Sequence, residues 1–118
     1  MDILVPKSAP STPARALPIR KRLRSNLRKN LGITRLFPLQ HVVLNHLLTH
    51  DSLHIDADLS LSAPTGSGKT LAYAVPVLQA LAASPFRALR AVIVVPSRDL
   101  AAQVKAVFDA LTPHTSLA

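Results

Sequence analysis

The sequence predicts an α/β fold in which helices flank a parallel β-sheet. Two apolar segments have the composition of strands, 59–63 and 90–95, and each is followed by the apolar spacing of a helix. A loop with two glycines joins the first strand to its helix. A strand, a helix and a second strand of these lengths form a right-handed crossover between parallel strands. Because two strands leave most of a sheet's edge and faces uncovered, we expect the sheet to be incomplete within this chain.

The second strand is the easier of the two to justify. Residues 90–95 read R-A-V-I-V-V and are bounded by Pro96. A continuous run of β-branched residues is typical of a strand that is covered on both faces, as in the middle of a parallel sheet. We therefore expect these side chains to be buried.

Four further segments have the apolar periodicity of helices, which we expect at 19–31, 38–50, 68–83 and 98–111. Gly32 is placed to end the first of these helices. Pro76 lies inside the third and predicts a bend, because proline removes one hydrogen bond from a helix interior. Ser97 precedes the fourth helix as its expected N-cap.

The basic residues are concentrated at the N-terminus. Residues 1–35 contain nine Lys or Arg and one Asp, whereas residues 36–118 contain five basic and five acidic residues. Residues 1–18 include four prolines without apolar periodicity, and we expect a disordered, basic, Pro-rich tail there. Such a charge distribution is typical of chains that contact polyanions such as nucleic acid, although a solvated tail would look the same.

Composition also excludes several classes of site. The chain has no Cys, which rules out disulfides and thiolate metal sites. No apolar run approaches the roughly 18 residues of a membrane-spanning helix, so we expect a soluble intracellular chain without membrane contact.

The segment 63–70, A-P-T-G-S-G-K-T, has the residues of a phosphate-binding loop (P-loop) between strand and helix. Its glycines allow positive φ, so that successive backbone amides can converge on a phosphate at the helix N-terminus. Lys69 is the expected catalytic residue, reaching the β- and γ-phosphates, and the Thr70 hydroxyl is an expected ligand of Mg²⁺. The full predicted nucleotide-binding set in this loop is Ala63, Pro64, Thr65, Gly66, Ser67, Gly68, Lys69 and Thr70. Ala63 stands where the usual pattern begins with Gly.

A second anion site is predicted at the start of the last helix. Arg98 lies in its first turn, beside backbone amides that also attract negative charge. The alternative is a solvated arginine whose stem lies along the helix.

Three segments in this order resemble the DEAD-box ATP-dependent RNA helicases. "LFPLQ", ending at Gln40, is similar to their Q motif, "SAPTGSGKT" to their first motif, where Ala63 is usual, and "VPSRDLA" to their motif Ia. The resemblance implies that Gln40 pairs with the adenine of ATP and that Pro96, Ser97 and Arg98 contact the RNA backbone. It further implies a P-loop NTPase fold of the RecA-like type, with residues 19–118 as the N-terminal portion of the first RecA-like domain.

The sequence lacks several features of this family. There is no Glu, so the Asp-Glu-Ala-Asp motif is absent, as are the Ser-Ala-Thr motif and the second RecA-like domain. Phe37 is the first aromatic residue, so the family's upstream aromatic that packs on adenine has no counterpart. We therefore expect ATP and Mg²⁺ as cofactors and RNA as partner, but no hydrolysis by this chain alone.

The residues of these motifs are most similar to those of the family branch that acts in large ribosomal subunit assembly. This resemblance implies precursors of ribosomal RNA as substrate and a nuclear, nucleolar location, with the cytoplasm as the alternative. Two other interpretations stay open from the residues. One is a P-loop NTPase of another class, which need not prefer ATP over GTP. The other is a basic nucleic-acid-binding module whose P-loop is vestigial and binds no ATP.

Overall fold

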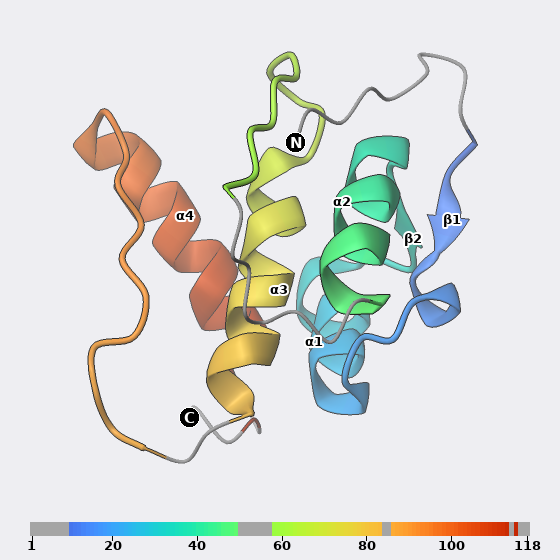
Figure 1. The fold of residues 1–118 in the computed structure, drawn as a ribbon, viewed down its shortest axis with the longest axis horizontal. Coiled ribbons are helices and arrows are strands. Elements are labelled where there is room, and N and C mark those ends of the chain that lie inside the picture. The colour runs from blue at the N-terminus through green and yellow to red at the C-terminus, as the bar shows by residue number, and fades with distance from the viewer. Residues whose placement is uncertain (1–9, 50–57, 84–85, 114, 116–118) are drawn as a thin grey trace.

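A computed structural model describes residues 10–49, 58–83, 86–113 and 115. Within these ranges the fold is dominated by helices (Figure 1). The chain order of the elements is β1 (Thr12–Pro13), the 3-10 helix η1 (Ala14–Ala16), α1 (Lys21–Leu31), β2 (Arg35–Leu36), α2 (Pro38–Thr49), α3 (Lys69–Ala82) and α4 (Arg98–Leu111).

The helices agree with the sequence prediction to within two residues at each end. Gly32 ends α1 in the left-handed conformation, with φ of 67°, and its amide donates to the carbonyl of Leu27. Ser97 caps α4, and its hydroxyl accepts a hydrogen bond from the amide of Leu100 at 3.2 Å. Pro76 is buried inside α3, which continues through it. Local spacing and capping residues are thus sufficient to define these elements.

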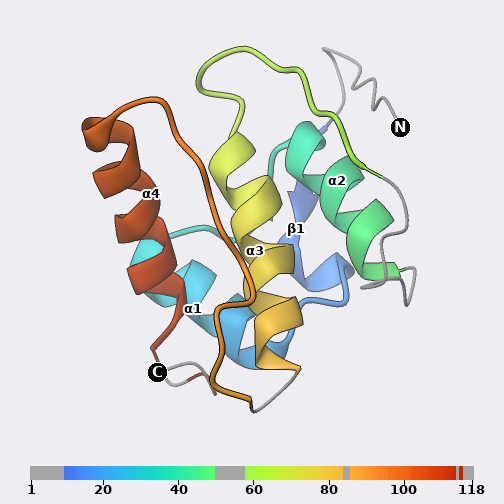
Figure 2. The same cartoon turned by 60° about the vertical axis from the view of Figure 1, so that its left-hand side comes forward.

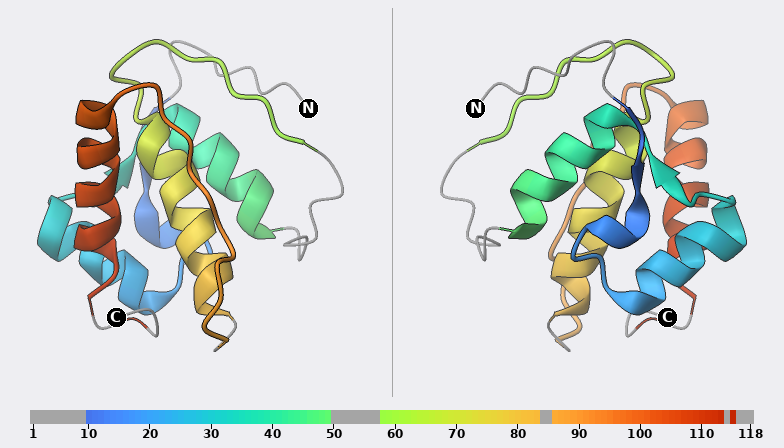
Figure 3. Two further views of the ribbon diagram at one scale, coloured as in Figure 1. Left: turned by 90° about the vertical axis from the view of Figure 1, so that its left-hand side faces the viewer. Right: turned by 90° about the vertical axis from the view of Figure 1, so that its right-hand side faces the viewer.

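The helices α3 and α4 run in the same direction, so that both begin at one end of the molecule (Figures 1 and 2). The extended segment 86–97 passes back along them between the end of α3 and the start of α4 (Figure 3). The core lies where α1, α3 and the end of α4 meet. Its fully buried side chains include Leu23, Leu27, Leu36, Leu44, Val75 and Leu111.

The described residues do not form the two parallel strands that the sequence predicts. Segment 59–63 has no strand beyond one bridge residue, Ser60, and segment 90–95 has none. The described strands are instead β1 and β2, an antiparallel pair with Thr12 opposite Leu36. Val92 and Val94 are 73% and 89% exposed, although we expected them to be buried. A strand requires hydrogen-bond partners on its edges and cover on its faces, and these two segments are not paired with each other.

Part of the predicted disordered tail has defined structure. Residues 10–18 include β1 and η1, and the side chains of Ala14 and Leu17 are buried in the core. The amide of Ala14 donates to the carbonyl of Thr34, and the side chain of Gln79 in α3 donates to the carbonyl of Pro18. These contacts are with residues distant in sequence, so composition alone could not predict them. Residues 1–9 lie outside the described ranges, and the division of the chain at residue 18 stays a prediction.

In the part of the chain that the structure describes, no helix has the length and apolar character needed to traverse a membrane.

Two asparagines of α1 donate hydrogen bonds to backbone carbonyls at the C-terminal end of α4. The side-chain amide of Asn26 donates to the carbonyls of Leu111 and Pro113 at 2.7 and 2.6 Å, and Asn26 is buried. The amide of Asn30 donates to the carbonyl of Ala110 at 2.7 Å in an exposed position. These bonds satisfy carbonyl groups that the end of a helix leaves without partners.

We expect Asn26→Ala to lower the free energy of unfolding by about 1–3 kcal/mol, because one buried and one partly buried hydrogen bond to backbone carbonyls are lost. Asn30→Ala is the matched control and should have an effect below about 1 kcal/mol, since water replaces the exposed donor. Urea unfolding followed by circular dichroism measures both. Equal effects of the two substitutions would contradict this assignment.

Candidate nucleotide-binding site

The loop before α3 has the backbone conformation that phosphate-binding loops require. Gly66 and Gly68 are both left-handed, with φ of 81° and 82°. Gly68 is the N-cap of α3 and has no side chain that could cap the helix. An anion placed at this helix N-terminus would accept hydrogen bonds from the amides of the first turn and would be favoured by the helix dipole.

The side chain of Lys69 folds back onto the loop. Its Nζ donates to the carbonyls of Ala63 and Pro64 at 2.6 and 2.8 Å. The carbonyl of Pro64 also accepts from the hydroxyl of Ser67 at 2.6 Å. The positive charge is therefore held at the mouth of the loop by two neutral carbonyls. A phosphate oxygen is a stronger partner for an ammonium group than a carbonyl, so an incoming phosphate could replace them.

Gln40 of α2 contacts this loop from the side. The side chain is 3% exposed, and its amide is engaged at both ends: Oε1 accepts from the amide of Phe37 at 2.8 Å, and Nε2 donates to the carbonyl of Gly68 at 3.2 Å. The structure thus brings the predicted base-selecting residue against the phosphate loop, 28 residues away in sequence. Its pairing with adenine stays a prediction.

Gly68 is closely packed as well as left-handed. A Cβ atom at this position would lie 2.2 Å from Nε2 of Gln40 and 3.0 Å from Cδ2 of Phe37. A Cβ atom at Gly66 would meet no heavy atom within 4 Å in the described structure. The sequence did not indicate the proximity of Phe37, which is 53% exposed and directly precedes α2. Its position three residues before Gln40 was the available signal.

Thr70, the predicted Mg²⁺ ligand, lies half-buried in the first turn of α3, next to Lys69. In the described ranges, no group of three His, Cys, Asp or Glu side chains is placed to hold a metal ion.

Pro96, Ser97 and Arg98 are exposed at the start of α4. They lie at the same end of the molecule as the start of α3, but on a different helix (Figure 2). The Ser97 hydroxyl already accepts from the helix, so its contribution to an anion site would be as a donor. The structure thus keeps this candidate anion site separate from the phosphate loop.

The substitutions Gly68→Ala and Gly66→Ala separate backbone strain from packing. Both place a side chain in the left-handed region, which we expect to lower the free energy of unfolding by about 1–2 kcal/mol. Gly68→Ala must also displace Gln40 and break its two hydrogen bonds, so we expect a further loss of about 1–3 kcal/mol. Urea unfolding measures the difference, and the NMR signal of the Gln40 side-chain amide should move only in Gly68→Ala. Indistinguishable variants would show that Gln40 does not pack on the loop.

Known proteins provide independent comparisons. The family model described as "DEAD/DEAH box helicase" matches residues 37–118, more than half of the chain. The chain is 48% identical over 89 residues to "DEAD-box ATP-dependent RNA helicase 1" of Arabidopsis thaliana, covering 75% of this chain and 17% of that protein. No solved structure shows a significant match.

Two further relatives are also called ATP-dependent RNA helicases. The chain is 43% identical over 115 residues to mouse "ATP-dependent RNA helicase DDX51", and the aligned region covers 90% of this chain and 18% of that protein. It is 39% identical over 103 residues to "ATP-dependent RNA helicase DBP6" of Meyerozyma guilliermondii, covering 80% of this chain and 16% of that protein. The chain thus spans less than a fifth of the length of each of these relatives. The extent of the family match shows that this chain belongs to the DEAD/DEAH box helicase family.

Proposed function

We propose that this chain is the ATP-binding and RNA-contacting portion of an ATP-dependent RNA helicase. The observation that carries the proposal is the contact of Gln40 with Gly68, which joins an amide suited to a nucleobase to a loop suited to phosphates. Names of the relatives support the activity, because each is called an ATP-dependent RNA helicase. The family also implies that the complete sheet is of the RecA-like type, with segments 59–63 and 90–95 as two of its strands.

The loop would bind the phosphates of Mg·ATP. Backbone amides of Gly66 to Thr70 surround the phosphate groups, and Lys69 exchanges its bonds with Ala63 and Pro64 for bonds with the phosphate oxygens. The Thr70 hydroxyl ligates the magnesium ion, which neutralises charge between the phosphates. In this chain the role of Lys69 is therefore to place a positive charge against the phosphates, and the ammonium is already held close to that position.

Adenine selection would fall to Gln40 and Phe37. A primary amide has two donor hydrogens and two acceptor lone pairs, and each end of the Gln40 amide uses one in the structure. One donor and one acceptor therefore remain for the edge of a base. Phe37 is half-exposed beside this amide, and its ring offers the stacking surface that the missing upstream aromatic residue provides in the family.

The start of α4 would contact the RNA backbone through Pro96, Ser97 and Arg98. Arg98 adds a charge to a helix N-terminus that already favours phosphate. Precursors of ribosomal RNA and a nucleolar location remain proposals that rest on the similarity of the motifs to the large-subunit assembly branch.

The 118-residue sequence contains no Glu and hence no Asp-Glu-Ala-Asp motif. We expect this chain to bind Mg·ATP and to release it unhydrolysed, since no carboxylate of that motif is available to hold the metal ion and orient water.

Isothermal titration with Mg·ATP tests the nucleotide site. We expect Lys69→Ala to weaken binding at least about tenfold, which is the effect of losing roughly 1.4 kcal/mol of charge-assisted hydrogen bonding. Lys105→Ala is the matched control: this lysine is exposed on α4 and pairs with Asp109, so binding should not change. Equal affinity in Lys69→Ala would contradict the proposed site. Hydrolysis by the purified chain that disappears in Lys69→Ala would contradict the expected lack of turnover.

A further inference from the structure

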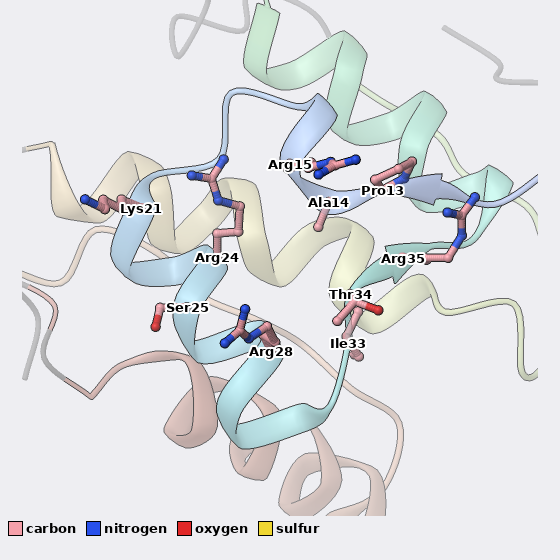
Figure 4. A pocket seen from close by; sticks show the side chains of 10 residues that line it. All are labelled: Pro13, Ala14, Arg15, Lys21, Arg24, Ser25, Arg28, Ile33, Thr34 and Arg35. Atoms are coloured by element: carbon pink, nitrogen blue, oxygen red, sulfur yellow. The ribbon is translucent and has the colours of Figure 1, made fainter.

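A basic hollow lies beside α1. It has a volume of about 590 Å³ and is bounded by α1 on one side and by η1 and the residues around β2 on the other (Figure 4). Its lining includes five basic side chains, Arg15, Lys21, Arg24, Arg28 and Arg35. We refer to these five residues as the α1 basic pocket.

The helix α1 directs three of these charges to one face. Lys21, Arg24 and Arg28 are three and four residues apart, and this spacing places them on the same side of a helix. Leu23 and Leu27 occupy the other side and are buried in the core. Burial of the two leucines therefore fixes the direction in which the three basic residues point.

Two further arginines line the hollow from other elements. Arg15 is on η1 and Arg35 is on β2, and Figure 4 shows them across the hollow from Arg24 and Arg28. Arg35 is held in place, because its Nε donates to the hydroxyl of Ser11 at 2.8 Å and its Nη2 to the carbonyl of Ser11 at 2.5 Å. One guanidinium is thus oriented before any ligand arrives, which reduces the entropy lost on binding.

The pocket has an electrostatic imbalance. The described residues that line it include no Asp or Glu. Four of the five basic residues are exposed and Arg24 is half-buried, so their charges remain accessible to a ligand. Like charges held together by a fold repel one another, and an anion that bridges them relieves that repulsion. The lining therefore favours a ligand with several negative charges.

We propose that the α1 basic pocket binds the phosphate backbone of RNA without regard to base sequence. Four of its five cations are arginines, whose planar guanidinium groups bind phosphate through paired hydrogen bonds. No aromatic residue is among the described lining, so the pocket offers no ring on which a base could stack. It shares no residue with the loop 63–70 or with Pro96–Arg98. The choice of RNA as ligand rests on the proposed function, whereas the pocket is an additional site.

Fluorescence anisotropy with labelled 20-nucleotide oligo(U) and oligo(A) tests the proposal. The pocket variant combines Lys21→Gln, Arg24→Gln and Arg28→Gln in the full 118-residue chain. The matched control removes three exposed charges that do not line the pocket, with Arg20→Gln, Lys29→Gln and Arg87→Gln. Both variants have the same net charge, so a difference between them reports on the position of the charges.

We expect the pocket variant to lose about tenfold in affinity for both RNAs. We also expect the slope of log K against log salt to fall by about 2, since each phosphate contact with a single strand contributes about 0.7. The control should lose less than about threefold. Arg28→Gln alone should have an intermediate effect, and circular dichroism should show unchanged helix content in every variant.

Several results would overturn the proposal. Equal losses in the pocket variant and the control would show that only net charge matters. A loss confined to one of the two RNAs would show base recognition. Unchanged RNA affinity together with lost binding to phosphatidylserine vesicles would assign the pocket to a lipid surface. An unmodified chain that binds Mg·ATP but no RNA would overturn this proposal and leave the nucleotide site intact, whereas RNA binding without Mg·ATP binding would contradict only the nucleotide site.

Discussion

The candidate site depends on one side chain that connects two helices. Gln40 on α2 binds the amide of Phe37 and the carbonyl of Gly68, so the loop before α3 is positioned from the side. The segment 59–63, which would support the loop as a strand, contains only one bridge residue, Ser60, in the described structure. Val43 of α2 and Ala72 of α3 are buried in the same apolar cluster, so the two helices pack against each other. Helix packing therefore fixes the geometry of the phosphate loop.

The sequence predicts the helices well and the sheet poorly, for a physical reason. A helix is determined by neighbours within four residues, and Gly32 and Ser97 mark their boundaries by local chemistry. A strand is stabilised by residues distant in sequence, so the β-branched run before Pro96 does not form one without partners. The bonds of Asn26 to the end of α4 are equally non-local, and no sequence pattern signalled them.

The same distinction between local and non-local contacts applies to the candidate site. The loop 63–70 is a contiguous motif, so its residues and its two left-handed glycines can be read from the sequence. The approach of Phe37 to Gly68 is a result of tertiary packing, and so is the position of Arg15 and Arg35 in one hollow with α1. Only the structure could show them. Much of the basic region 1–35 is a folded surface, because α1 carries many of its charges on the side away from the buried leucines.

The most direct test of the nucleotide site is an NMR titration of the folded chain with Mg·ATP and, separately, with Mg·GTP. We expect Mg·ATP to shift the backbone amides of Gly66 and Gly68 together with the side-chain amide of Gln40, and Mg·GTP to shift the Gln40 amide less. Shifts confined to the α1 basic pocket, or no shifts in a sample that remains folded, would contradict the proposed nucleotide site.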